Sequence, residues 1–249
     1  MAEPYFTFFP ILPYDISKTG QTTDVRNLLR GFRIRPEVID NRAAYYNFDI
    51  RDWDTPENLA DKIYGSPHLY WIIFKMNKGI NPFWEWPLAQ RQFEEFLVEK
   101  YPDDAIFVSA LTGQFTVGET ITGGTSSATG VVVSTDTTNF NTASRTSPHA
   151  KVVISSPTGT FTSDETISGG TSLKTATFEK KQLHTQSDHH FEDANGNQVD
   201  ADLLNATTIS VHSYENSLNE ARRSIKMLRS EYVGAIVNEF EAIMLAGGS

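Results

Sequence analysis

The sequence contains no cysteine among its 249 residues, which excludes a disulfide framework, a thiolate metal site and a cysteine nucleophile. It has no apolar run close to the roughly 20 residues that cross a bilayer. The first residues, Met1 to Phe6, show neither the basic region nor the apolar core of a secretory signal peptide. We therefore expect a protein that matures in a reducing cytoplasm and has no membrane partner.

Positive charge is scarce as well. The formal net charge is −10 and the pI is about 5.0, so binding to the phosphate backbone of nucleic acid is not expected. The chain lacks Gly-x-Ser-x-Gly, His-Glu-x-x-His and the phosphate-binding glycine loops. We predict no enzymatic activity and no cofactor. Aromatic residues, in contrast, reach 12%, which points to extensive protein interfaces.

Two short helices are predicted between Asp54 and Asn77. Asp54 is the expected N-cap of the first, Pro56 lies in its first turn, and Gly65 is its expected C-cap. The second helix starts at Ser66-Pro67 and is apolar around most of its circumference, so it must be buried. Its expected core residues are Leu69, Trp71, Ile72, Ile73 and Met76. A half-buried strand is predicted just before the pair, at residues 44–50.

This order of strand, capped helix, glycine turn and second helix looks like a LysM module. The runs Asp54 to Gly65, Leu69 to Ile73 and Asn81 to Leu88 resemble the LysM-like region of phage tail baseplate proteins. They are most similar to the baseplate wedge subunit family of T-even-type contractile-tailed phages. The N-terminal Phe-Phe-Pro stretch and the run from Arg222 to Val233 are also similar to that family, so the resemblance covers both ends of the chain.

Together with an internal repeat at residues 107–172 that interrupts it, the resemblance leads us to expect an α+β fold: a LysM-like β-α-α core, an inserted all-β repeat domain, and a C-terminal hairpin plus helix that completes the core. The expected segments are an extended arm at 1–43, the LysM-like domain at 44–101, the insert at 102–182, and the C-terminal part at 183–249. It further implies a non-enzymatic structural subunit that assembles with other wedge proteins and the tube or sheath-initiator ring. Such a protein belongs to the virion and is assembled in the host cytoplasm.

LysM modules bind peptidoglycan, which gives an alternative function: a glycan-binding module of a tail-associated protein. The connector Asn81 to Pro87 departs from the LysM pattern, because its prolines oppose a ladder strand there. Its tryptophans can stack on sugars or anchor a protein interface, where Trp is a frequent hot spot. We favour the interface and expect little peptidoglycan binding. The predicted interface residues are Phe8, Phe9, Trp71, Phe83, Trp84, Trp86, Tyr232 and Phe240.

Residues 107–126 and 153–172 form an internal repeat with an offset of 46 residues, sharing Thr-Gly-x-Phe-Thr-x-x-Glu-Thr-Ile-x-Gly-Gly-Thr-Ser. Each copy predicts strand, turn, strand, Gly-Gly turn and strand. The pairs Gly123-Gly124 and Gly169-Gly170 are expected to supply positive φ in tight hairpin turns. The repeat therefore predicts a small all-β unit of two equivalent halves.

After Leu183 we predict a hairpin at 190–199 with Asn195-Gly196 as a type I′ turn, then a polar connection at 200–217. Residues 218–228 fit a helix or, near Ile225, a strand. A helix capped by Ser230 is expected to run to the C-terminus.

Asp188, His189, His190 and Glu192 are residue types that bind zinc. Alternation along a strand would place the two histidines on opposite faces, and no metal site is predicted. The nearby run Asp193 to Asp200 also fails the calcium-loop pattern, because Gln198 and Leu204 occupy the positions that require Gly and Glu.

Overall fold

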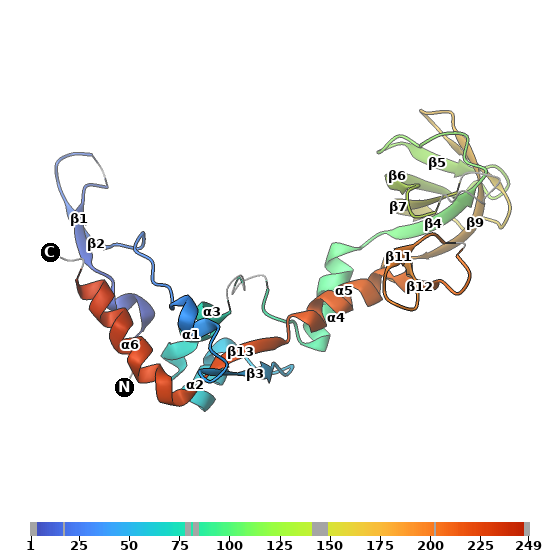
Figure 1. The fold of residues 1–249 in the computed structure, drawn as a ribbon. Coiled ribbons are helices and arrows are strands. Elements are labelled where there is room, and N and C mark those ends of the chain that lie inside the picture. Colours follow the sequence, from blue (N-terminus) through green and yellow to red (C-terminus); the bar gives the residue numbers. More distant parts are fainter. Residues whose placement is uncertain are drawn as a thin grey trace. The chain divides into compact units, whose positions relative to one another are not determined.

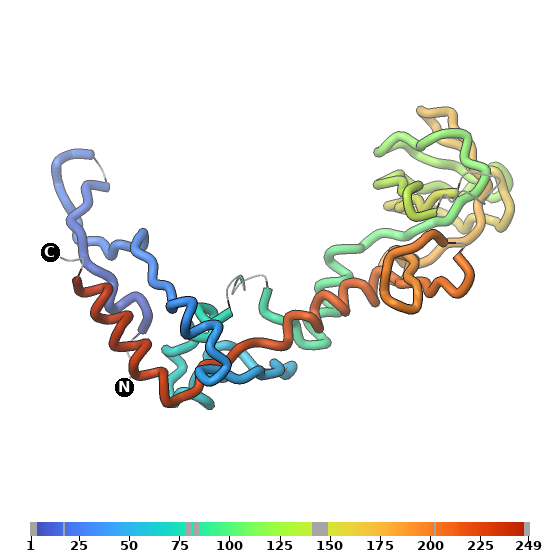
Figure 2. The backbone as a smooth tube through the Cα atoms, viewed as in Figure 1, coloured from blue at the N-terminus to red at the C-terminus, as the bar shows by residue number. Residues whose placement is uncertain are grey.

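The computed structural model describes residues 4–16, 18–77, 81, 85–140, 149–201 and 203–246. The chain forms two compact units: unit 1 comprises residues 1–89 and 219–249, and unit 2 comprises residues 90–218. Figure 2 traces the backbone through unit 1, into unit 2 and back to unit 1. Helices and strands are both present (Figure 1), so the α+β class is confirmed. The four finer segments expected from the sequence stay a prediction.

Unit 1 contains the predicted strand and first helix. Strand β3 spans Tyr45–Asp49 and helix α2 spans Pro56–Tyr64, which ends at Gly65 with φ 76° as expected. The predicted N-cap Asp54 is wrong by one residue: Thr55 is the cap, and its Oγ1 accepts from the backbone N of Asn58 at 3.2 Å. The Asp54 carboxylate accepts from the backbone N of Arg51 at 3.0 Å instead. With Pro56 in the first helical position, the residue before it becomes the cap.

The second helix consists of a 3₁₀ turn, η2 (Pro67–Leu69), followed by α3 (Tyr70–Met76). All five expected core residues of this segment are buried. Asn77 ends α3 as predicted, and its side chain joins the helix to β13 (Ser224–Leu228). Its Nδ2 donates to the carbonyl oxygens of Ile73 and Lys226, both at 2.8 Å, and its Oδ1 accepts from the Lys226 backbone N at 2.7 Å. One side chain thus fixes segments that lie about 150 residues apart in sequence.

Strand β13 pairs with β3 in antiparallel register, from Ser224 opposite Asp49 to Leu228 opposite Tyr45. The strand alternative near Ile225 is therefore confirmed. Helix α6 (Ser230–Leu245) follows, and Val233, Ile236, Phe240 and Met244 enter the same core. Ser230 is the first residue of this helix and Arg229 is its N-cap residue, so the predicted Ser230 cap is wrong.

The N-terminal segment contributes both core and surface to unit 1. Phe9, Phe32, Ile34 and Ile39 are buried in the same core as α3 and α6, which makes part of this segment integral to the unit. Its elements are η1 (Tyr5–Phe8), β1 (Ile11–Tyr14), β2 (Thr23–Arg26) and α1 (Pro36–Ile39).

Unit 2 begins with helix α4 (Gln90–Lys100), in which Phe93 and Leu97 are buried. A closed six-stranded barrel follows, with strand order β4-β7-β6-β5-β8-β9 (Figure 1). Its strands are β4 (Asp104–Ser109), β5 (Thr120–Gly123), β6 (Thr129–Asp136), β7 (Ala150–Thr158), β8 (Thr166–Gly169) and β9 (Thr175–Leu183). The second three strands start 46 residues after the first three, so the sequence repeat is also a repeat of structure.

The Gly-Gly pairs do not have the predicted role. None of these four glycines has positive φ; in their loops Ser127 (56°) and Leu173 (54°) adopt that conformation. Gly123 and Gly169 are required for space, because a Cβ would lie 2.6 Å from Glu165 Oε1 in one repeat and 2.7 Å from the Glu119 carboxylate in the other.

The remaining part of unit 2 contains η3 (His184–Gln186), a three-stranded sheet in the order β11-β10-β12, and most of helix α5 (Val211–Ala221). The strands are β10 (Asp188–Glu192), β11 (Gln198–Val199) and β12 (Thr207–Ser210). The predicted polar connection is wrong, because β12 and α5 occupy it.

The predicted hairpin is present, but its turn is not type I′. Gly196 has φ 80°, whereas Asn195 is not among the residues with positive φ. The backbone N of Gly196 donates to the Asp193 carbonyl, and the Asp193 N donates to the Asn197 carbonyl. This is a three-residue loop with a glycine bulge.

Candidate interface on the N-terminal arm

The most exposed apolar surface of unit 1 lies on the β1–β2 ribbon and the turn after it. Among the residues that the structure describes, the two strands pair only with each other, with Leu12 opposite Val25 and Tyr14 opposite Thr23. Alternation places these four residues on one face of the ribbon. Every residue of β1 is exposed, including Tyr14 at 60%. In a soluble monomer such an apolar ribbon would normally have one face covered.

The turn after β2 presents two further apolar side chains. Leu28 is 64% exposed and Leu29 is 99% exposed. The turn is held by its own polar groups, because Asn27 Oδ1 accepts from the Leu29 backbone N at 3.2 Å and the Leu28 N donates to the Arg26 carbonyl at 3.0 Å. These two hydrogen bonds therefore fix a turn in which both leucine side chains are exposed to water.

The base of the ribbon is anchored to the core. Arg26 Nη1 donates to the carbonyl of Phe9 at 3.2 Å, and the Asn27 backbone N donates to that of Pro10 at 2.9 Å. Arg30 Nη2 donates to the Ile243 carbonyl on α6 at 3.0 Å. Tyr5 stacks on Phe240, with ring centroids 5.0 Å apart.

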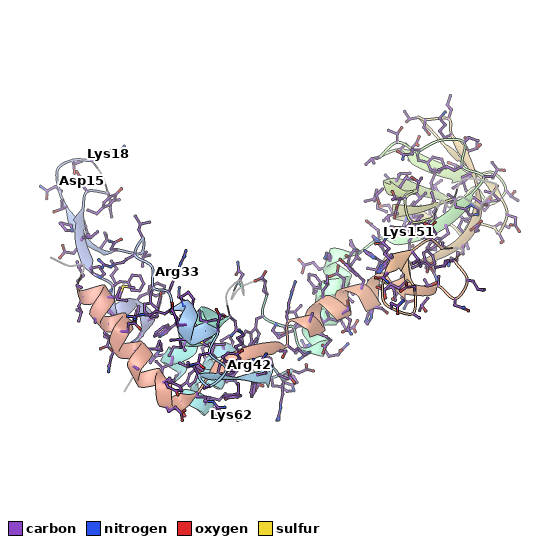
Figure 3. All side chains as sticks on the ribbon, in the orientation of Figure 1. Asp15, Lys18, Arg33, Arg42, Lys62 and Lys151 are labelled. Carbon is purple, nitrogen blue, oxygen red and sulfur yellow. The ribbon has the colours of Figure 1, made fainter. Side chains whose placement is uncertain are left out.

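The far end of the ribbon has a built turn of its own. The Asp15 carboxylate accepts from the backbone N of Thr19 at 3.2 Å and of Gly20 at 2.6 Å. Figure 3 shows Asp15 and Lys18 at this end, with Arg33 on the chain that leads from the ribbon to α1. The described part of the arm thus combines a fixed base, a closed tip and an uncovered apolar surface between them. We call Leu12, Tyr14, Val25, Leu28 and Leu29 the arm surface.

The comparisons with known proteins cover this same region. Residues 5–105 match the family model described as base plate wedge protein 53. The baseplate wedge protein gp53 of Enterobacteria phage T4 is 28% identical over 102 residues, which is 39% of this chain and 50% of that protein. Residues 5–105 are therefore similar to the baseplate wedge protein 53 family. The chain spans about half the length of the curated relative that it matches.

The wedge-family match includes the arm surface, β3, α2, α3 and α4, and it ends at residue 105, within β4. Almost all of the barrel therefore lies outside the matched residues. The resemblance of the run from Arg222 to Val233 to the same family stays a prediction, because the match does not extend to it.

The structure places the predicted interface residues in three different environments. Phe9, Trp71 and Phe240 are buried in the core of unit 1, where their rings contact one another or Tyr5. Phe8 and Trp86 are half-buried, and the Trp86 Nε1 donates to the Asp54 carbonyl at 3.0 Å.

Tyr232 is exposed, and Phe83 and Trp84 lie outside the described residues. The interface role of all eight residues stays a prediction. Sequence reasoning missed Leu28 and Leu29, because two leucines in a helical or strand pattern are normally assigned to a core.

The histidine pair of unit 2 has a different geometry from the one expected. The predicted placement on opposite faces is wrong, because the register of β10 against β12 shifts at His189. The Nδ1 atoms of His189 and His190 are 2.7 Å apart, and His190 Nε2 lies 2.9 Å from Glu192 Oε1. Over the described ranges, no three His, Asp or Glu side chains are grouped so as to hold a metal ion. In the same ranges no helix has the length and apolar character needed to cross a membrane.

Proposed function

We propose that this chain is a structural subunit of a contractile-tail baseplate wedge, and that the arm surface binds a neighbouring wedge subunit. The observation that carries this proposal is the overlap of the two findings above: the match to the wedge protein family contains the arm, and the arm exposes apolar side chains. The proposal includes a non-enzymatic role, assembly with other wedge proteins and with the tube or sheath-initiator ring, and a place in the virion.

Leaving the apolar arm surface in water costs free energy that a partner subunit would recover. An isolated two-stranded hairpin is marginally stable, and burial of apolar surface stabilises by about 25 cal/mol per Å². Leu28 and Leu29 sit on a turn whose backbone is already hydrogen-bonded, so little conformational entropy is lost when a partner covers them. A groove lined by apolar side chains on a neighbouring subunit is the partner surface that fits.

The LysM-like core is part of the proposal. In unit 1 the order β3, α2, α3 and β13 gives two helices between two antiparallel strands. This supports a LysM-like frame in which the second strand comes from after unit 2 instead of from the connector at 81–87. On this reading the frame is a docking platform, with Phe8, Tyr232 and the connector tryptophans as further contacts.

A substitution at the most exposed leucine tests the role of the arm. Leu29→Asp should leave the stability of unit 1 within about 0.5 kcal/mol, because the side chain touches water in the free chain. It should weaken association with co-expressed wedge proteins by about tenfold or more, because a carboxylate would be buried without a partner. Leu204→Asp, at an 85% exposed leucine of unit 2, is the matched control. Equal co-purification of Leu29→Asp and the control would overturn the proposal for the arm.

One observation favours the alternative of peptidoglycan binding. Trp53 is 84% exposed and precedes the start of α2, next to Asp54, whose carbonyl accepts from Trp86 Nε1. An exposed indole at the start of the first helix is suited to stacking on a sugar. Sedimentation with purified peptidoglycan tests it: retention that is lost in Trp53→Ala would support glycan binding, and a chain left wholly in the supernatant would remove it.

A further inference from the structure

The barrel of unit 2 is built from two halves that interlock. Half 1 is residues 104–136 and half 2 is residues 150–183. Strand β4 of half 1 pairs only with β7 and β9, which both belong to half 2. Strand β7 of half 2 pairs only with β4 and β6, which both belong to half 1. The first strand of each half therefore lies between two strands of the other.

Two buried carboxylates of the barrel also join one half to the other. Glu119 of half 1 accepts from the backbone N of Thr171 at 2.9 Å and of Ser172 at 2.7 Å, and from the Ser172 hydroxyl at 2.7 Å. These donors lie in the Gly-Gly-Thr-Ser loop of half 2. A fourth bond, from the Thr116 backbone N at 2.6 Å, comes from its own half.

Glu165 of half 2 repeats this arrangement in the opposite direction. It accepts from the backbone N of Thr125 and of Ser126, both at 2.9 Å, and from the Ser126 hydroxyl at 2.7 Å. The Thr162 N of its own half completes the set at 2.7 Å. We call these two sets of bonds the carboxylate latches. Each half carries a carboxylate that fits the loop of the other half.

The apolar core is shared in the same way. It contains Ile106, Ile121 and Val132 from half 1 together with Val152, Ile154 and Ile167 from half 2. A half by itself would expose this core, leave its first strand unpaired and leave its carboxylate without the opposite loop. The closed barrel has no free strand edges, so a stable state requires two complementary halves.

We propose that a half of one chain can pair with the complementary half of a second copy, so that the barrel links two chains. Nothing in the strand pairing, the latches or the core requires that both halves belong to the same chain. The connection between them, residues 137–149, holds the two halves at an effective concentration on the order of millimolar. Exchange between copies is therefore expected when chains fold together at high concentration. This inference does not depend on the wedge role.

Intermolecular complementation of the full-length chain tests the proposal. One variant carries Glu119→Ala and Gly123→Val, which damages both latch elements of half 1. The other carries Glu165→Ala and Gly169→Val, which damages both elements of half 2. In either chain alone neither latch can form. After refolding together, exchange gives one barrel that combines the intact half 2 of the first chain with the intact half 1 of the second.

Introduced cysteines detect this barrel, because the chain has none of its own. Thr122 and Ser168 are opposite residues on the paired strands β5 and β8, and both are exposed. Thr122→Cys is placed on the chain with intact half 1 and Ser168→Cys on the chain with intact half 2. We expect a disulfide-linked dimer after refolding. The same two cysteines in one otherwise unaltered chain are the geometric control and should close within the chain.

The matched control moves each cysteine to the other variant, so that both lie on damaged halves. The proposal predicts at least tenfold more linked dimer for the first arrangement than for the second. For a mixture of the two variants without cysteines, it also predicts a dimer by native mass spectrometry. Slow hydrogen exchange should then appear in at most half of the barrels, because only one barrel of each dimer combines two intact halves. Equal linking in both arrangements, or a mixture that remains two monomers without protected barrel amides, would overturn it.

Discussion

Replacement of Glu119 by Gln should destabilise the barrel by about 3 to 5 kcal/mol. Each carboxylate oxygen of Glu119 accepts two hydrogen bonds: Oε1 from the Thr116 N and the Ser172 hydroxyl, and Oε2 from the Thr171 N and the Ser172 N. Gln has one side-chain oxygen, so only one of these two pairs of donors keeps its acceptor. If the Gln amide nitrogen faces Ser172 Oγ, the Ser172 hydroxyl can turn and accept a hydrogen bond from it. The Thr116 backbone N is then left without an acceptor, which destabilises the folded barrel by about 1 to 3 kcal/mol. The two bonds at the remaining oxygen lose the charge of their acceptor, which removes about 1 kcal/mol each.

The assay must distinguish the two units. All four tryptophans, at positions 53, 71, 84 and 86, lie in unit 1, so their fluorescence reports the unfolding of unit 1 and serves as an internal reference. Native-state hydrogen exchange of the β7 and β9 amides reports the barrel. Glu165→Gln should have the same effect, since its bonds are equivalent. Glu179→Gln, at a partly exposed carboxylate 3.4 Å from His149, should change stability by less than about 1 kcal/mol. A Glu119→Gln effect no larger than that of Glu179→Gln would refute the reasoning.

Three further predictions concern acid, the end of α3 and the helix cap. Burial alone would raise the pKa of Glu119, but the hydrogen bonds from Ser172, Thr171 and Thr116 outweigh it and lower the pKa to about 2; bonds from Ser126, Thr162 and Thr125 do the same for Glu165. Because both folded-state pKa values lie below the unfolded value of 4.5, the unfolded chain binds more protons between pH 4.5 and 2. The latches should therefore stabilise the barrel fully above about pH 4.5 and lose this contribution as the pH falls through 2, whereas the double Gln variant should show a flatter acid profile by hydrogen exchange. Asn77→Ala should destabilise unit 1 by about 2 to 4 kcal/mol in tryptophan-monitored denaturation, because it removes two hydrogen bonds to Lys226 of β13 and one to Ile73 of α3; an effect under 0.5 kcal/mol would contradict the assigned role. Thr55→Ala should lower the free energy of unfolding of the same unit by about 1 kcal/mol, because it removes the N-cap of α2. Asp54→Ala should lower it by less.

Local signals predicted the segments whose structure depends on near neighbours in sequence. Pro56 and Gly65 bound α2 because a missing N–H and a positive φ act within one turn. The apolar circumference of α3 predicted its burial for the same reason. The repeat predicted two equivalent halves, since similar sequences adopt similar backbones.

Helix α5 was not predicted, because its sequence is adapted to contacts with distant segments of the chain. The apolar pattern of α5 is interrupted by two buried polar residues, so its helical spacing is hidden. Glu215 accepts from Lys100 Nζ at 2.8 Å and from the Tyr101 hydroxyl at 2.6 Å. Asn219 exchanges hydrogen bonds with the backbone of Leu88.

The role of Gly123 and Gly169 was missed for a similar reason. The carboxylate that needs their space comes from the other repeat, and local turn chemistry carries no information about it. The exposure of the arm surface likewise depends on which of its side chains the rest of the chain packs against. Periodicity within the sequence does not contain that information.

Hydrogen exchange of the arm in the free chain and in an assembled baseplate tests the central claim most directly. The amides of β1 and β2 should exchange rapidly in the isolated chain, because over the described residues the ribbon pairs only with itself. In the assembly they should be protected, while the amides of α3, buried in both states, should change little. Equal protection of the arm in both states would contradict the account.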